Sequence, residues 1–261
     1  YCGWRCVSSN LNVYKIIMPK LKLYNPVKRV LITQGFGENK LAFYKDELGL
    51  LGHNGLDMIA FDGEPVLAAH DGRVTFAGYD GSGGLGVVIR TNEEFEYGDG
   101  ISYFKTISWH LKKGSLLVTG GDQVVRGQKI AEADNTGMST GSHLHFGLKP
   151  IAKGENDWEW YSTEDKNGYH GAVDPAPYFV KFQNPMKVGD QSQDVRELQE
   201  FLVKQNYFPT IPTGYYGEIT KRSVFAFQKR YCNLSWYERN VMKGSKAGEK
   251  TLSALNNLYE K

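Results

Sequence analysis

The sequence has few cysteines and no long hydrophobic run. Its three cysteines, Cys2, Cys6 and Cys232, show neither C-x-x-C spacing nor a second pair nearby. This argues against a zinc ribbon, and we interpret the three as incidental thiols. No apolar stretch approaches the roughly 20 residues that are needed to span a bilayer, so we expect no membrane span.

The sequence also lacks an excess of either charge. Its 31 basic and 29 acidic residues give a net charge of +2, which argues against nucleic acid as the main partner. Residues 184–261 hold 12 basic and 8 acidic residues, a net charge of +4. Residues 1–183 therefore carry a net charge of −2. This split favours an anionic surface as the target of the C-terminal part.

The N-terminal stretch YCGWRCVSSNLNVYKII has neither the basic start nor the apolar stretch of a signal peptide. Two readings stay open: Met18 is the native start, or the chain was trimmed after removal of a signal. We therefore treat residues 1–19 as a segment of uncertain status.

The pattern of the sequence changes near residue 182. Before it, short β-rich runs such as RVTFAGYD and GVVIRT alternate with glycine turns, which predicts an antiparallel sheet. After it, apolar residues recur at the three- and four-residue steps of a helix. These residues are Val195, Leu198, Leu202, Val203, Val224, Phe225 and Phe227. At 261 residues we predict an α+β chain with two domains, residues 20–181 and a small three-helix domain at 182–261.

One motif is misleading. GSGGLG, residues 81–86, fits the glycine pattern of dinucleotide-binding loops, but it runs into the strand-like VVIRT. A dinucleotide site needs a helix whose N-terminus faces the phosphates. We interpret the motif as a flexible turn.

Four of the metal-ligand side chains occur in two pairs. His53 and Asp57 are four residues apart around Gly55, and His143 and His145 are two apart. Residues an even number apart in a strand share a face, so each pair can converge. Asn54-Gly55 also suits a turn, and the first pair can equally converge from a loop.

Imidazole and carboxylate ligands suit zinc, and a catalytic zinc site uses three protein ligands with an open fourth position. The two pairs offer four candidate side chains for three protein ligands, so one is left over. If His53 and Asp57 bind with one histidine of the 143/145 pair, the other lies beside the reacting water as a base. No H-E-x-x-H helix is present to supply a glutamate base.

The chain from about Val30 to Phe179 resembles the lysostaphin-type (LytM-like) zinc endopeptidases of bacterial cell walls. The resemblance is carried by TQGFGE, GHNGLDMIAFDGEPVLAAHDGRV, WHLKKGSLLVTGGDQVVRGQKIA and NTGMSTGSHLHF. It implies that His53, Asp57 and His145 bind zinc and that His110 and His143 are catalytic. It also implies a substrate in the stems or cross-bridges of peptidoglycan.

This sequence departs from the family at two positions. Ser108 stands where a tyrosine is common, and Gly147 follows HLHF where a glutamate is common. Both departures concern contacts to substrate rather than the metal. The two remaining histidines, His70 and His170, are expected to be structural or exposed.

The C-terminal part resembles the small helical peptidoglycan-binding domains. VGDQSQDVRELQEFL and GYYGEITKRSVFAFQKR carry this resemblance, through the paired Leu198-Gln199 and Phe227-Gln228, Thr220 and the glycine-flanked turn at 214–217. Beyond Cys232, NLSWYERNVMKGSKAG stretches the usual closing repeat. A folding spacer is the alternative reading of this part.

The two resemblances together imply a monomeric, zinc-dependent endopeptidase that acts outside the cell on bacterial peptidoglycan. Phage lysin and secreted housekeeping enzyme both fit. The alternative is a catalytically inactive peptidoglycan-binding protein or amidase activator, although such proteins typically lack the ligands that this chain has. Because ligand histidines must be neutral to bind metal, acidification should disable the site, with the loss of activity setting in near pH 6.

Overall fold

A computed structural model describes residues 19–28, 31–39, 43–155 and 160–259. The chain forms two compact units. Among the described residues, the sheet unit comprises 19–21 and 26–177, and the helical unit comprises 22–25 and 178–259. The predicted domain bounds, 20–181 and 182–261, stay a prediction. Cys2 and Cys6 lie outside the described residues.

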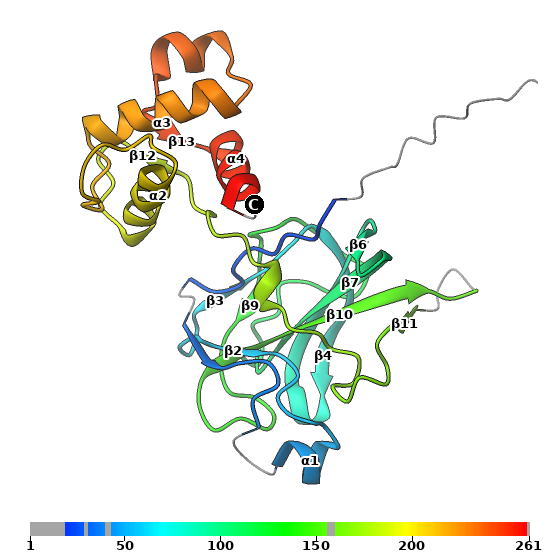
Figure 1. The fold of residues 1–261 in the computed structure, drawn as a ribbon. Coiled ribbons are helices and arrows are strands. Elements are labelled where there is room, and N and C mark those ends of the chain that lie inside the picture. Colours follow the sequence, from blue (N-terminus) through cyan, green and yellow to red (C-terminus); the bar gives the residue numbers. More distant parts are fainter. Residues whose placement is uncertain (1–18, 29–30, 40–42, 156–159, 260–261) are drawn as a thin grey trace, which may run out of the picture. The chain divides into compact units, whose positions relative to one another are not determined.

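An antiparallel sheet dominates the sheet unit, as predicted (Figure 1). Among the described residues its strands follow the order β1-β2-β10-β7-β5-β4-β8, with β11 paired to β10 and β6 to β7. The strands are β1 (Ile32–Gln34), β2 (Leu56–Ile59), β4 (Gly72–Asp80), β5 (Gly84–Thr91), β6 (Phe95–Tyr97), β7 (Gly100–Trp109), β8 (Gln123–Val124), β10 (His143–Lys153) and β11 (Trp160–Ser162). A separate pair is formed by β3 (Pro65–Leu67) and β9 (Lys129–Glu132), and α1 is Phe43–Leu48.

The two faces of this sheet differ. In β10, Leu144, Phe146 and Leu148 are at most 1% exposed, so they belong to the core. Successive side chains of a strand alternate between faces, so His143 and His145 point to the opposite face. We call this the site face, because it carries the predicted ligands.

The GSGGLG stretch is a turn between two strands. A short 3-10 helix, Gly81–Gly83, connects β4 to β5, and the two strands pair antiparallel. No helix N-terminus follows the glycines, so the reading as a turn is confirmed.

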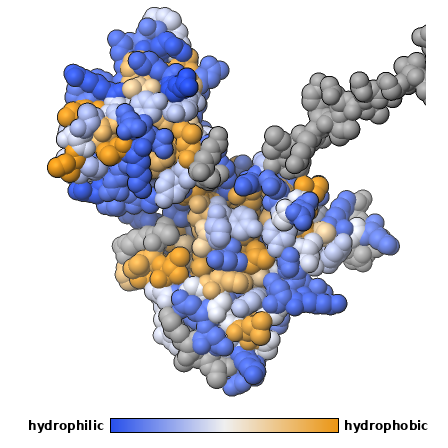
Figure 2. Space-filling view, viewed as in Figure 1, coloured by the Kyte–Doolittle hydropathy of each residue, from blue (hydrophilic) through white to orange (hydrophobic). Residues whose placement is uncertain are grey.

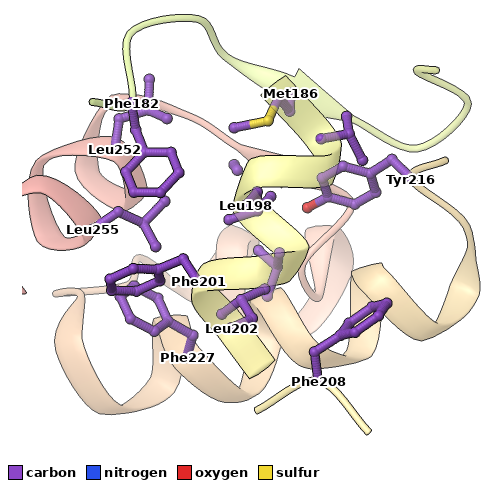
Figure 3. Packing of buried hydrophobic residues seen from close by; sticks show 13 residues of the cluster. Phe182, Met186, Leu198, Phe201, Leu202, Phe208, Tyr216, Phe227, Leu252 and Leu255 are labelled. Atoms are coloured by element: carbon purple, nitrogen blue, oxygen red, sulfur yellow. The ribbon is translucent and has the colours of Figure 1, made fainter. Parts of the chain in front are cut away.

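The helical unit contains α2 (Gln193–Lys204), α3 (Glu218–Tyr231) and α4 (Glu249–Tyr259), with a π-helical turn at Glu238–Met242 and a strand pair, β12 (Met186–Lys187) with β13 (Lys246–Ala247). Figure 3 shows Leu198 and Leu202 of α2 packed among aromatic side chains from the neighbouring segments. Val195, Leu198, Leu202, Val224 and Phe227 are fully buried, as the periodicity predicts. Val203 is 39% exposed, because one residue past Leu202 the helix has turned by about 100°.

The pairs Leu198-Gln199 and Phe227-Gln228 have equivalent structural roles. The buried Gln199 side chain donates to the Tyr215 carbonyl at 2.9 Å and to Thr220 Oγ1 at 2.8 Å. Gln228 donates in the same way to the Lys246 carbonyl and Thr251 Oγ1, both at 2.8 Å. Each glutamine therefore fastens the loop that precedes the next helix.

Hydrophobic surface is scattered in small patches between polar side chains on the face that Figure 2 shows. Within the part of the chain that the structure describes, no helix has the length and apolarity that crossing a membrane requires. Cys232 is a free, half-buried thiol.

Candidate metal centre and catalytic site

The predicted ligands converge from two neighbouring strands and one loop. His145 in β10 pairs directly with Asp57 in β2, which places both side chains on the site face. His53 lies in the irregular segment before β2 and Asp57 lies in β2, so the loop alternative is correct for His53 and the strand alternative for Asp57. The even spacing of the 143/145 pair acts as predicted, since both histidines approach Asp57.

Three donor atoms form a compact triangle. His53 Nε2 lies 2.9 Å from His145 Nδ1 and 3.1 Å from Asp57 Oδ1, and His145 Nδ1 lies 3.2 Å from Asp57 Oδ1. In a tetrahedral zinc site with bonds of about 2.0–2.1 Å, neighbouring ligand atoms are about 3.3 Å apart. The triangle fits zinc in both donor chemistry and size.

Gly55 allows the histidine to approach. A Cβ atom at this position would lie 2.7 Å from His145 Nε2 and 2.7 Å from the Phe146 carbonyl oxygen. Neither atom can yield without moving a ligand or a central strand. The glycine between His53 and Asp57 therefore makes room for the third ligand.

The electrostatics of the centre keep its carboxylate charged. Burial alone would raise the pKa of Asp57, but hydrogen bonds with His143, His145 and His53 outweigh burial and hold the pKa far below its usual range. Burial lowers the pKa of His145. Both directions favour the forms that bind metal, an ionised carboxylate and a neutral imidazole.

Backbone carbonyls orient three of the histidines. His53 Nδ1 lies 3.1 Å from the Gly35 oxygen, His110 Nδ1 lies 2.8 Å from the Thr136 oxygen, and His143 Nδ1 lies 2.8 Å from the Gly141 oxygen. A carbonyl only accepts, so the proton of each ring resides on Nδ1. The Nε2 lone pair of each ring is then free for a ligand or a proton.

His110 is held in a strained backbone conformation beside the centre. It follows β7 with a φ of 62°, in the left-handed region that side chains other than glycine rarely adopt. Its ring lies 4.7 Å from that of His143 and 6.1 Å from that of His145, between centroids. This geometry places the ring beside the metal centre.

The environment separates the two histidines that the resemblance marks as catalytic. Burial lowers the pKa of His110 to about 4. Burial also opposes charge on His143, but hydrogen bonds to Asp57 and to the Gly141 carbonyl outweigh it and raise the pKa. His143 Nε2 lies 3.5 Å from Asp57 Oδ1, outside the triangle of donors.

The other histidines lie away from the centre. His70 is 5% exposed and its Nε2 lies 3.0 Å from Thr106 Oγ1, a structural role. His170 is exposed.

Some contributors could not be assigned from residue type. Gly35, Thr136 and Gly141 act through carbonyl oxygens, and they lie within TQGFGE and NTGMSTGS, where the sequence singled out none of them. The ring of Tyr44 in α1 lies 5.6 Å from the ring of His53. Burial, and then the charge of Asp57, raise its pKa to about 12, so the hydroxyl stays protonated at the edge of the centre.

Comparison with known families agrees with this geometry. The sequence model of peptidase family M23 matches residues 51–157, which hold the whole donor triangle. The chain contains an M23 peptidase domain. A second model, Putative peptidoglycan binding domain, matches residues 191–232 in the helical unit. The M23 domain with its His53, Asp57 and His145 cluster is of the zinc peptidase type.

Individual relatives are similar to parts of the chain. The peptidoglycan DD-endopeptidase ShyB of Vibrio cholerae is 42% identical over 94 residues, 36% of this chain and 20% of the relative. The glycyl-glycine endopeptidase ALE-1 of Staphylococcus capitis is 35% identical over 104 residues, 38% of this chain and 25% of the relative. The murein hydrolase activator NlpD of Escherichia coli is 31% identical over 107 residues, which are 40% of this chain and 25% of the relative.

Among solved structures, the catalytic domain of lysostaphin from Staphylococcus simulans is 26% identical, with a TM-score of 0.42, over 57% of this chain and 91% of that chain. The chain spans a quarter or less of the length of the curated relatives above.

Proposed function

We propose that this chain is a zinc-dependent endopeptidase that hydrolyses peptide bonds in the stems or cross-bridges of peptidoglycan and is directed to the wall by its helical unit. The observation that carries the proposal is the triangle of His53, Asp57 and His145 with two oriented histidines beside it. The named activities of ShyB and ALE-1 support the substrate class.

The three donors would hold the metal. When bound there, zinc supplies a Lewis acid that polarises a carbonyl and lowers the pKa of water toward neutrality. The Gly35 carbonyl fixes the ring of His53 so that Nε2 faces the centre. Asp57 remains an anion at neutral pH and would offset the metal's charge.

The remaining two histidines would handle protons. His143 is the more basic of the pair, and its Nδ1 donates to Gly141, so its Nε2, 3.5 Å from Asp57 Oδ1, would accept the proton of the attacking water. His110 Nε2, with the lower pKa, would stabilise the developing oxyanion or pass a proton to the leaving amine. In the neutral tautomer Nε2 carries no hydrogen, so either role needs a proton there first.

The helical unit would raise the concentration of the enzyme at the wall. Peptidoglycan is a solid mesh, and a linked binding module makes the second encounter intramolecular. The match of residues 191–232 to peptidoglycan-binding domains supports this role.

Defined peptidoglycan supplies the test. The zinc-loaded chain should release new amino groups, and mass spectrometry of the digest should identify the bond. No release from any peptidoglycan, with binding intact, would favour the second candidate, a peptidoglycan-binding activator. The similarity to the murein hydrolase activator NlpD is the observation that favours this second candidate.

A further inference from the structure

Four basic side chains stand side by side across the sheet. Arg73 of β4 pairs with Arg90 of β5, Arg90 pairs with Lys105 of β7, and Lys105 pairs with Lys149 of β10. Directly paired residues of neighbouring strands point to the same face, so all four share one face. We call these four residues the cationic row; β4, β7 and β10 can be followed in Figure 1.

The row lies on the site face. In β10, His145, Gly147 and Lys149 alternate with the buried Leu144, Phe146 and Leu148, so ligand and lysine point the same way. Four residues of an antiparallel strand span about 13 Å. The row therefore crosses the site face about 13 Å along β10 from the metal ligand.

No carboxylate of the described residues forms an ion pair with the cationic row. Ion pairs of the sheet unit are made by Lys112 and Lys129 instead, and the Nε of Arg90 is buried without a hydrogen-bond partner. Asp80 favours the charged form of Lys149 but forms no ion pair with it. Gly147, between His145 and Lys149 on the same face of β10, supplies no carboxylate.

The arrangement is unfavourable for the protein alone. Like charges directly opposite each other destabilise a sheet. Burial lowers the pKa of Lys105, and burial followed by the charge of Lys105 lowers the pKa of Lys149. Residues 1–183 carry a net charge of −2, so the row is not part of a generally basic surface.

Aromatic side chains hold the guanidinium of Arg90 in place. Its guanidinium carbon lies 3.9 Å from the centroid of the Trp160 ring and 5.9 Å from that of Tyr103. The two aromatic rings contact each other edge to face at 5.0 Å. Stacking on Trp160 fixes the plane of the guanidinium, which reduces the entropy lost when an anion binds.

We propose that the cationic row is a subsite for a carboxylate of the substrate, which makes the substrate an acidic peptide. The proposal rests on the proposed function, because it places the cleaved bond at the donor triangle. An extended peptide covers about 3.3–3.6 Å per residue. The recognised carboxylate therefore lies about four residues from the cleaved bond.

The test compares two substrates and two proteins. Soluble peptides released from purified peptidoglycan are used with their carboxyl groups free or converted to amides. For the wild-type chain, amidation should raise KM about 10-fold with little change in kcat, since charge-assisted contacts are lost. For Lys105→Gln/Lys149→Gln, KM should be high with both substrates and zinc content should match wild type.

Lys129→Gln is the matched control. Lys129 is also a strand lysine of this unit, but it pairs with Glu132, so its loss should leave the 10-fold preference intact. The double variant should unfold at no lower temperature than wild type, because like-charge repulsion is relieved. If the double variant keeps the wild-type preference for free carboxyl groups, or if wild type shows none, the inference is wrong.

Failure of the proposed function would look different. The same peptides, labelled at their amino groups, are titrated with the full chain after zinc removal, so that binding is read without cleavage by fluorescence anisotropy. Tighter binding of the free-acid peptides without any hydrolysis by the zinc-loaded chain would refute the enzyme and support the row. Equal binding of both peptides together with hydrolysis would refute the cationic row as a carboxylate subsite, while the proposed endopeptidase activity would stand.

Discussion

His53 Nε2 and His145 Nδ1 lie 2.9 Å apart, although 92 residues separate them in the chain. Two imidazole nitrogens at this distance, each within 3.2 Å of the same Asp57 oxygen, form a ready metal site. His143 and His110 lie beside this site without joining it. The geometry thus separates proposed ligands from proposed catalysts.

The first prediction uses this separation. His145→Ala should lose both zinc and activity, because the triangle loses one of three donors. His143→Ala and His110→Ala should keep zinc and lose about 100-fold or more in rate, as expected for a positioned acid or base. Metal analysis with kinetics checks this; zinc lost from His143→Ala but kept in His145→Ala would reverse the assignment.

The second prediction concerns Thr136 as a positioning residue. Its hydroxyl donates to the Leu111 carbonyl at 2.6 Å and accepts from the Leu85 amide at 3.0 Å, which fixes the carbonyl that orients His110. Thr136→Val should lower kcat about 10-fold while zinc content and KM stay close to wild type.

Thr136→Ser retains the hydroxyl and is the matched control. It should restore most of the rate. Equal kcat in Thr136→Val and wild type would show that the hydrogen bonds of the Thr136 hydroxyl do not position His110.

Much of this site could be predicted from the sequence because its chemistry lies in side chains with fixed spacing. The two pairs, His53 with Asp57 and His143 with His145, and the antiparallel sheet are examples. The carbonyls of Gly35 and Thr136 could not be found, since every residue type carries one. The cationic row could not be found either, because Arg73, Arg90, Lys105 and Lys149 meet only through strand register.

The third prediction is a pH dependence of stability. Burial lowers the pKa of His70 from its ordinary 6.5, so below about pH 6.5 the unfolded chain takes up a proton that the folded chain does not. The stability contributed by neutral His70 is therefore complete above pH 6.5 and is lost as the pH falls. The slope from one such group is at most about 1.4 kcal/mol per pH unit.

Urea unfolding of wild type and His70→Gln between pH 8 and pH 5 measures this slope. The variant is expected to be less stable at pH 8 but to lose less on acidification, because it has no imidazole to protonate. Parallel curves for the two proteins would show that His70 does not titrate as described.

The fourth prediction concerns the helical unit. Deleting residues 184–261 should spare zinc binding and cleavage of a small soluble peptide, while lysis of intact walls should fall about 10-fold or more. The cut also uncovers Phe182, whose amide donates to Asn256, so folding of the shortened chain is checked first by circular dichroism.

The separate helical unit should sediment with purified peptidoglycan. Moderate salt should weaken this only slightly, because a net charge of +4 on residues 184–261 is small. A unit that stays in the supernatant, with unchanged lysis by the shortened enzyme, would make it a spacer.

The central claim is that the triangle of His53, Asp57 and His145 holds a zinc ion on which peptidoglycan cleavage depends. The most direct measurement is the release of amino groups from purified peptidoglycan as zinc is returned, in steps, to the chelator-treated chain. We expect no release without zinc and full recovery at about one zinc per chain. Full activity of the metal-free chain, or recovery in His145→Ala equal to that of wild type, would contradict it.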